Sequence, residues 1–201
     1  MKVGIIGGTF DPIHLAHLII AEEARSKLEL DKVIFIPAGE PWMKSGKNIT
    51  RVKNRVEMVN LAIESNPWFE ISTIETEQPG PAYTVDTLEQ LWKELGYETQ
   101  MFLLMGWDSL MDMPRWKAPY RISKMAKLVA FPRQGTKRPD IADLEKSMPE
   151  ITERLTILEE PYMGISSTDI RTRVAEGKSI RYLIPDAVAA YINENKLYKK
   201  T

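Results

Sequence analysis

Short apolar runs alternate with longer segments along almost the whole chain. The runs are five to seven residues long and rich in apolar, often β-branched, residues, a pattern typical of strands buried on both faces. In the longer segments apolar residues recur every three or four positions, as Ala16, Ile20 and Ala24 do, which is typical of amphipathic helices. The sequence therefore predicts six strands, at 2–7, 33–37, 69–75, 100–106, 127–133 and 154–159.

Five helices are predicted around these strands. Asp11 is the expected N-cap of the first helix and Pro12 or Ile13 its first residue, and Gly96 is expected to end the third. The polar segment 134–150 is bordered or interrupted by prolines, and we expect a surface excursion there. The predicted helices span 12–28, 51–65, 84–95, 167–177 and 185–198.

Strands and helices that alternate at this spacing predict parallel strands joined by right-handed crossovers. We expect a single α/β domain over 1–201, a Rossmann-like doubly wound sheet with helices on both faces, and a C-terminal helical part from about residue 166. Sheets of this kind bind ligands beyond the carboxyl ends of their strands, where the strand order reverses. The functional residues are therefore expected in the loops that follow the strands.

Composition limits the partners and the kinds of chemistry that we expect for the chain. The 27 Lys and Arg residues nearly balance the 28 Asp and Glu residues, which gives no global attraction for nucleic acid or an anionic membrane. The absence of cysteine excludes disulfides, thiolate nucleophiles and cysteine-ligated zinc. Neither a signal peptide nor a membrane-spanning run is visible, so we expect a cytoplasmic protein.

The stretch GGTFDPIHLAHL holds both histidines of the chain, His14 and His17, where the first strand gives way to the first helix. It is neither a G-x-G-x-x-G fingerprint nor a phosphate loop, but Gly7 and Gly8 allow phosphates to approach the backbone. Three-residue spacing puts both imidazoles on one helix face, beside backbone N–H groups, where they can donate to phosphate oxygens. The alternatives are histidines that merely cap or pack, or a metal site, for which the sequence shows no third ligand nearby.

A second stretch, ISSTDIR, starts at Ile165. Ser166, Ser167 and Thr168 stand at the start of a short helix, with Arg171 one turn further on. Hydroxyl groups, helix N–H groups and a guanidinium suit phosphate oxygens, although the same residues also make a plain capping sequence. A shared phosphate pocket requires both stretches to lie on the carboxyl edge of the sheet.

These two stretches resemble the paired motifs of the nucleotidyltransferase superfamily, T/H-x-G-H and ISSTxIR. In the first, Ala16 stands where most members have glycine. Further stretches resemble the bacterial nicotinate-mononucleotide adenylyltransferase family, so that the resemblance covers nearly the whole chain. They are FIPAGEPWMK, NRVEMVNLAI, AYTVDTLEQL, LLMGWDSLMDMPRW and YLIPDAVAAYI.

The resemblance implies an enzyme of NAD biosynthesis. It would join ATP and nicotinate mononucleotide to give deamido-NAD (nicotinate adenine dinucleotide) and pyrophosphate, with Mg²⁺ held mainly by substrate phosphates and water. No nucleic acid or membrane partner is implied, and family members include homo-oligomers. The implied catalytic residues are His14, His17, Lys44 and Arg171; the ATP-binding residues are Gly7, Gly8, Thr9, Phe10, His17, Ser166, Ser167, Thr168 and Arg171; and the nicotinate-mononucleotide-binding residues are Lys44, Tyr83, Thr84, Gly106, Asp108 and Trp116.

Several residues have a plainer interpretation. Arg55 and Met58 are interpreted as helix surface and helix core, Asp86 and Thr87 as capping residues, and Lys44 could be a solvated charge. Met43 also departs from the family, in which histidine is frequent at the matching position.

Three other functions remain open from the sequence. The acceptor could be nicotinamide mononucleotide or phosphopantetheine, although enzymes acting on the latter are typically shorter and lack the Y-T-x-D-T and G-x-D…W segments. The chain could also be a nucleotide-binding module without catalysis. A dehydrogenase fits the fold class but lacks its glycine fingerprint.

Overall fold

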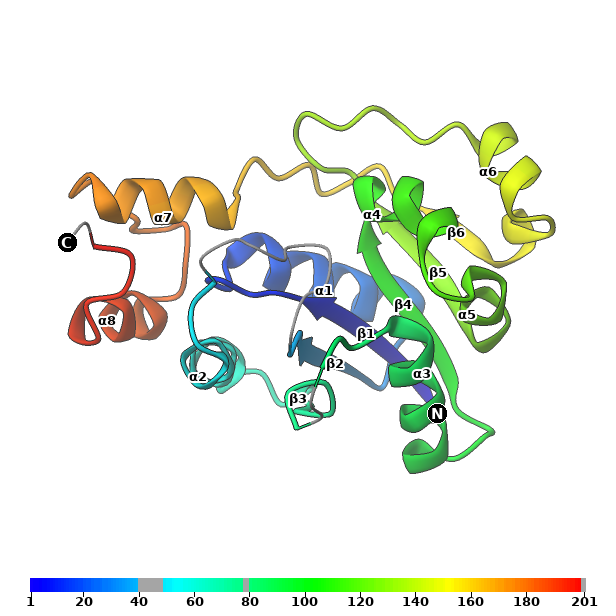
Figure 1. Cartoon of the computed structure of the whole chain (residues 1–201), viewed down its shortest axis with the longest axis horizontal. Helices are drawn as coiled ribbons and strands as arrows, with labels where there is room; N and C mark the ends of the chain where they lie inside the picture. The colour runs from blue at the N-terminus through cyan, green and yellow to red at the C-terminus, as the bar shows by residue number, and fades with distance from the viewer. Residues whose placement is uncertain (40–48, 78–79, 200–201) are drawn as a thin grey trace.

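The computed structural model describes residues 1–39, 49–77 and 80–199. Six parallel strands form one sheet in the order β3-β2-β1-β4-β5-β6 (Figure 1). This confirms the predicted doubly wound α/β fold. The strands are β1 (Lys2–Gly8), β2 (Lys32–Pro37), β3 (Phe69–Ile71), β4 (Gln100–Gly106), β5 (Ala126–Phe131) and β6 (Leu155–Ile157).

Helices cover both faces of the sheet, because successive strand residues point to opposite sides. In β1, for example, Ile5 packs into one apolar cluster and Ile6 into the other. The first cluster is covered by α3 (Thr84–Leu95), α4 (Trp107–Asp112), α5 (Pro119–Met125) and α6 (Ile141–Ser147), and the second by α1 (Leu15–Leu28), α2 (Val52–Ile63), α7 (Ser167–Ala175) and α8 (Asp186–Glu194). Figure 1 shows α7 and α8 at the end of the molecule away from α6. Two short 3₁₀ helices, η2 (Met113–Arg115) and η3 (Ile151–Arg154), complete the described elements.

The strand order reverses between β1 and β4. The chain builds outward from β1 through β2 to β3, then returns to place β4 on the other side of β1, where Ile6 pairs with Leu104. The carboxyl ends of these strands, at Gly8 and Gly106, are therefore neighbours at the switch point. Loops at such a reversal diverge and leave room for a ligand.

The start of α1 differs from the prediction. The sequence predicts Asp11 as N-cap and a helix from Pro12 or Ile13, whereas the helix begins at Leu15 and His14 is the N-cap residue. Asp11 cannot cap the helix because its carboxylate accepts hydrogen bonds from Tyr198 and from the Thr50 amide. The chain turns at Phe10, where φ is 47°.

Other boundaries also move. The third strand ends at Ile71, and β5 ends before Pro132, which has no N–H to donate to a ladder. The segment 134–150 contains α6, whose N-cap Asp140 accepts a hydrogen bond from the Ala142 amide at 2.9 Å. A helix of seven residues carries too little periodicity to stand out in the sequence. The same applies to α4 and α5.

Candidate active site

The histidine pair lies at the start of α1, where His14 is the N-cap residue and His17 lies in the first turn. The His14 and His17 rings stack with centroids 3.7 Å apart, and Phe10 meets the His17 ring edge-on at 5.0 Å. His17 Nδ1 accepts a hydrogen bond from the His14 amide at 3.2 Å. A neutral His17 imidazole therefore carries its proton on Nε2, which is the nitrogen that can donate to a phosphate oxygen.

His14 is buried and held neutral. Its side chain is 6% exposed, and burial lowers the pKa of its imidazole from 6.5 to about 4, with a further lowering by the nearby positive charge of Arg133. Its Nδ1 is buried and has no hydrogen-bond partner within the described residues. A buried polar atom without a partner is costly, and an approaching phosphate oxygen would supply one.

The second motif touches the first. Ser167 Oγ donates to the Pro12 carbonyl at 2.9 Å, and Arg171 Nη1 donates to the Asp11 carbonyl at 2.7 Å. These bonds join residues 155 and 160 positions apart in the sequence, so the two motifs meet as the shared pocket requires.

Some groups expected to be open to ligand are engaged within the protein. Ser166 Oγ caps α7 by accepting from the Asp169 amide at 3.1 Å, and Thr168 Oγ1 accepts from Arg171 Nη2 at 3.3 Å. The Leu15 amide, at the start of α1, donates to the Leu183 carbonyl at 3.0 Å. The hydroxyls of the second motif therefore build the turn that presents Arg171.

Gly7 and Gly8 differ in their surroundings. A Cβ atom on Gly7 would meet nothing within 4 Å, whereas one on Gly8 would crowd the Phe10 ring at 2.9 Å. The Gly7 backbone is thus approachable from outside at the carboxyl end of β1. Thr9, the next residue, contributes its carbonyl to the Arg55 guanidinium at 2.8 Å.

The end of β4 brings Asp108 to the same edge. Asp108 lies in the first turn of α4, two residues after Gly106, and forms an ion pair with Arg133, which follows β5. Its Oδ1 faces Gly106 and has no hydrogen-bond partner within the described residues. A larger residue than glycine at 106 would collide with this carboxylate. Arg133 was not singled out from the sequence; its place at the carboxyl end of a predicted strand is the signal that could have found it.

The predicted acceptor residues Tyr83, Thr84 and Trp116 lie at the start of α3 and at the end of η2. Tyr83 is the N-cap residue of α3 and Thr84 its first residue, so helix N–H groups face outward there. Trp116 is half-buried and its indole Nε1 has no hydrogen-bond partner within the described residues. The neighbouring Lys117 lies 4.6 Å from the Tyr83 ring centroid and pairs with Asp86, which ties the two segments together.

Arg55 corrects an expectation. The sequence interprets it as helix surface, but it is 1% exposed. Its guanidinium donates to the carbonyls of Thr50 at 3.0 Å, Thr9 at 2.8 Å and Gly39 at 3.1 Å. The buried Arg55 guanidinium therefore links the loops after β1 and β2 to the residues that precede α2. Sequence reasoning missed it because its position on the helix face carries no sign of what faces it.

Comparisons with known proteins identify the family of the chain. The Cytidylyltransferase-like family model matches residues 5–173. A probable nicotinate-nucleotide adenylyltransferase of Dehalococcoides mccartyi (strain ATCC BAA-2266 / KCTC 15142 / 195) is 43% identical over 200 residues, covering 100% of this chain and 98% of the relative. Another, from Roseiflexus sp. (strain RS-1), is 48% identical and covers 98% of both chains.

The chain belongs to the nicotinate-nucleotide adenylyltransferase family. This membership confirms the resemblance read from the motifs. Among solved structures, the Plasmodium falciparum nicotinic acid mononucleotide adenylyltransferase complexed with NaAD shares the fold, with a TM-score of 0.80 at 19% identity. The match covers 98% of this chain and 97% of that one.

The described residues of this adenylyltransferase include no ready set of ligands for a metal ion. Lys44, expected in the acceptor loop, lies outside the described residues, as does Met43. In 1–39, 49–77 and 80–199, no group of three or more His, Asp or Glu side chains is arranged to hold a metal ion. The described residues therefore do not form a set of protein ligands that could replace the water molecules around a cation.

No helix in the described part of the chain is long and apolar enough to cross a bilayer.

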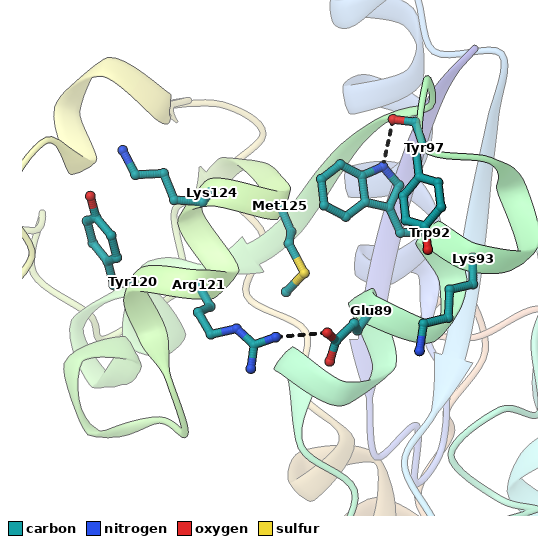
Figure 2. A pocket seen from close by; sticks show the side chains of 8 residues that line it. All are labelled: Glu89, Trp92, Lys93, Tyr97, Tyr120, Arg121, Lys124 and Met125. Atoms are coloured by element: carbon teal, nitrogen blue, oxygen red, sulfur yellow. Dashed lines mark hydrogen bonds and ion pairs between the residues drawn. The ribbon is translucent and has the colours of Figure 1, made fainter.

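A cavity of about 350 Å³ lies elsewhere on the adenylyltransferase, between α3 and α5 (Figure 2). Its walls include Trp92, whose Nε1 donates to the Tyr97 carbonyl at 3.0 Å, and the Arg121–Glu89 ion pair. The lining residues come from the second half of α3 and the loop after it, which lead into β4, and from α5, which leads into β5, so the cavity lies toward the amino edge of the sheet. None of the predicted site residues lines it.

Proposed function

We propose that this adenylyltransferase transfers AMP from ATP to nicotinate mononucleotide, giving deamido-NAD and pyrophosphate in NAD biosynthesis. The family name shared by the relatives supports this reaction, as does the NaAD complex of the Plasmodium protein. The observation that carries it is the contact between the two motifs, Arg171 to Asp11 and Ser167 to Pro12, beside the stacked histidines. That contact creates one place where a triphosphate meets donors from both motifs.

The proposed chemistry is a direct displacement. An oxygen of the acceptor phosphate attacks the α-phosphorus of ATP, a new P–O bond forms, and the bond to the departing pyrophosphate breaks. No protein nucleophile is needed, because the acceptor phosphate already carries negative charge. The protein's contribution is to position the two substrates and to stabilise charge on the phosphate oxygens.

The ATP phosphates would lie over Gly7, Gly8, Thr9 and Phe10. His17 Nε2–H and the neutral His14 ring would donate to oxygens at the reacting phosphate, as the occupied Nδ1 of His17 and the low pKa of His14 support. Arg171, with the start of α7 formed by Ser166, Ser167 and Thr168, would hold the departing pyrophosphate. When bound, Mg²⁺ would neutralise phosphate charge through substrate oxygens and water.

The acceptor would occupy the side of the site built by α3, α4 and η2. The Trp116 indole offers a flat face to the nicotinate ring, and the amides at Tyr83 and Thr84 suit its carboxylate. Asp108 and Gly106 would lie against ribose, and Lys44 would approach the acceptor phosphate. We further expect a cytoplasmic enzyme that binds neither nucleic acid nor membranes. Assembly into a homo-oligomer stays a prediction.

The test is pyrophosphate release by the purified chain with ATP and Mg²⁺. Nicotinate mononucleotide should support turnover best, with nicotinamide mononucleotide, phosphopantetheine and no acceptor as comparisons. A preference for either rival acceptor would contradict the substrate assignment. Binding of ATP without pyrophosphate release in any mixture would favour a non-catalytic nucleotide-binding module instead.

A further inference from the structure

The end of the chain folds back onto the first motif. After α8 the backbone turns with positive φ at Lys196 (51°) and Tyr198 (62°), a region that non-glycine residues seldom adopt. The Tyr198 hydroxyl then donates to Asp11 Oδ1 at 2.7 Å, across 187 positions of sequence. An uncommon backbone conformation persists where surrounding contacts fix it, and this hydrogen bond is such a contact.

Asp11 is the point where several segments meet. It is 4% exposed, and its two carboxylate oxygens accept from Tyr198 and from the Thr50 amide, the latter at 3.3 Å. Its main-chain carbonyl accepts from Arg171 at 2.7 Å. A rotation of the Asp11 residue would therefore alter the carbonyl that orients the Arg171 guanidinium. The same turn leads directly to the histidine N-cap of α1.

Tyr198 is suited to hold that residue still. Its ring packs against the apolar cluster under α1, α2, α7 and α8, so the hydroxyl approaches Asp11 from a fixed direction. Burial, together with the negative charge of Asp11, raises the pKa of the phenol above its ordinary value of 10. The hydroxyl therefore remains a proton donor at any pH at which the enzyme would work.

We propose that Tyr198 is a positioning residue for the nucleotidyl transfer: through Asp11 it holds the first motif and Arg171 in the geometry that receives the triphosphate. This rests on the proposed function. Tyr198 acts through another residue and touches no reacting atom. The predicted effect of losing its hydroxyl is on substrate handling more than on folding.

Tyr191 supplies a matched control. It lies in α8, seven residues before Tyr198, and is likewise half-buried. Its hydroxyl also bonds to another segment, donating to Asn54 Oδ1 of α2 at 3.1 Å. That bond ties α8 to α2 without reaching Asp11 or the phosphate-binding groups. Each hydroxyl makes one part-buried hydrogen bond to a side chain of another segment, and Tyr198 adds only a long contact to Met58 Sδ at 4.0 Å, so their removal should affect stability similarly.

The experiment compares Tyr198→Phe with Tyr191→Phe in the full chain. Both variants keep the aromatic ring and its packing. Tyr198→Phe should lower kcat/KM for ATP by about tenfold or more, while Tyr191→Phe stays within about twofold of the wild type. Thermal midpoints should fall by similar small amounts in both. Equal activity in the two variants would overturn the proposal.

A double-mutant cycle identifies the route. If Tyr198 acts through Asp11 on Arg171, Tyr198→Phe should cost far less in an Arg171→Ala background than in the wild type. Full additivity of the two losses would contradict that route.

ATP affinity, measured by titration calorimetry, separates this inference from the proposed function. A wild type that binds ATP but releases no pyrophosphate refutes only the reaction, and weaker ATP binding by Tyr198→Phe would still support the positioning role. If the wild type does not bind ATP, both ideas fail.

Discussion

At the residue scale, burial and local hydrogen bonds determine the charge and the orientation of the side chains in the candidate site. His14 is neutral because its surroundings penalise the imidazolium form, and His17 is oriented because its Nδ1 is occupied by a backbone amide. Arg55, in contrast, keeps its charge in the interior by giving its N–H groups to three carbonyls. Type and spacing in the sequence identified the histidines, but could not show which neighbours each side chain would acquire.

Loss of His17 should affect the chemical step. If its Nε2–H stabilises charge at the reacting phosphate, His17→Ala should reduce kcat by about 10² or more with a smaller change in the ATP KM. Steady-state pyrophosphate release measures both constants. Near-normal turnover by His17→Ala would reject the role.

The buried His14 should make stability depend on pH. Its folded pKa of about 4 lies below the ordinary 6.5, so the unfolded chain binds a proton that the folded chain excludes. Stability from this residue is therefore complete above pH 6.5, falls as pH drops from 6.5 toward 4, and levels off below. The full effect is about 3 kcal/mol. Urea unfolding across this range should show a steeper loss of stability with falling pH in the wild type than in His14→Gln.

Arg133 contributes to the low pKa of His14 but is the smaller cause, after burial. Arg133→Gln should therefore raise the pKa of the His14 imidazole while leaving it below 6.5. An NMR titration of the two histidines measures this directly, with His17 as an internal comparison. An unchanged His14 pKa would show that the charge of Arg133 does not reach the ring.

At the element scale, much of the architecture could be predicted because alternating periodicities carry most of the information in a parallel sheet. The apolar strands and the longer helices were visible in the sequence, and so was the meeting of the two motifs beyond β1. What could not be predicted were features decided by distant partners. Asp11 looks like a helix cap beside Pro12, and only the folded chain shows that Tyr198 and Thr50 claim its carboxylate. The short helices α4, α5 and α6 were missed because six or seven residues display no repeat.

The α6 helix provides a stability test away from the site. Asp140→Ala removes the side chain that accepts from the Ala142 amide, and should cost about 1 kcal/mol of unfolding free energy. Activity should not change, because α6 contains none of the predicted site residues. Denaturant unfolding and pyrophosphate release, measured on the same sample, check both parts. A loss of turnover without a loss of stability would contradict this separation.

At the scale of the whole molecule, the site depends on contacts between segments far apart in the chain. Ser167 and Arg171 reach the first motif from the C-terminal part, and Arg55 reaches it from α2. Sequence motifs could predict that the first two stretches share a ligand, because each has the composition of a phosphate site. They could not predict Arg55 or Tyr198, whose roles arise from burial and from what they face.

Arg55 tests this dependence most directly. Arg55→Leu would leave the carbonyls of Thr50, Thr9 and Gly39 without their buried donor, at a cost of about 1–3 kcal/mol for each group that stays dry. We expect a marked fall in the thermal midpoint together with weakened ATP binding. Arg55→Lys should recover part of the stability but not all three contacts. Wild-type behaviour of Arg55→Leu would show that these bonds are dispensable.

The bond between Tyr198 and Asp11 has a consequence for biosynthesis of the protein. The ribosome makes Asp11 187 residues before Tyr198, so the growing chain can assemble the sheet while the nucleotide loop still lacks its Tyr198 contact. A chain cut short before Tyr198 would then be folded but catalytically weak. Competence would arrive only after Tyr198 has left the ribosome.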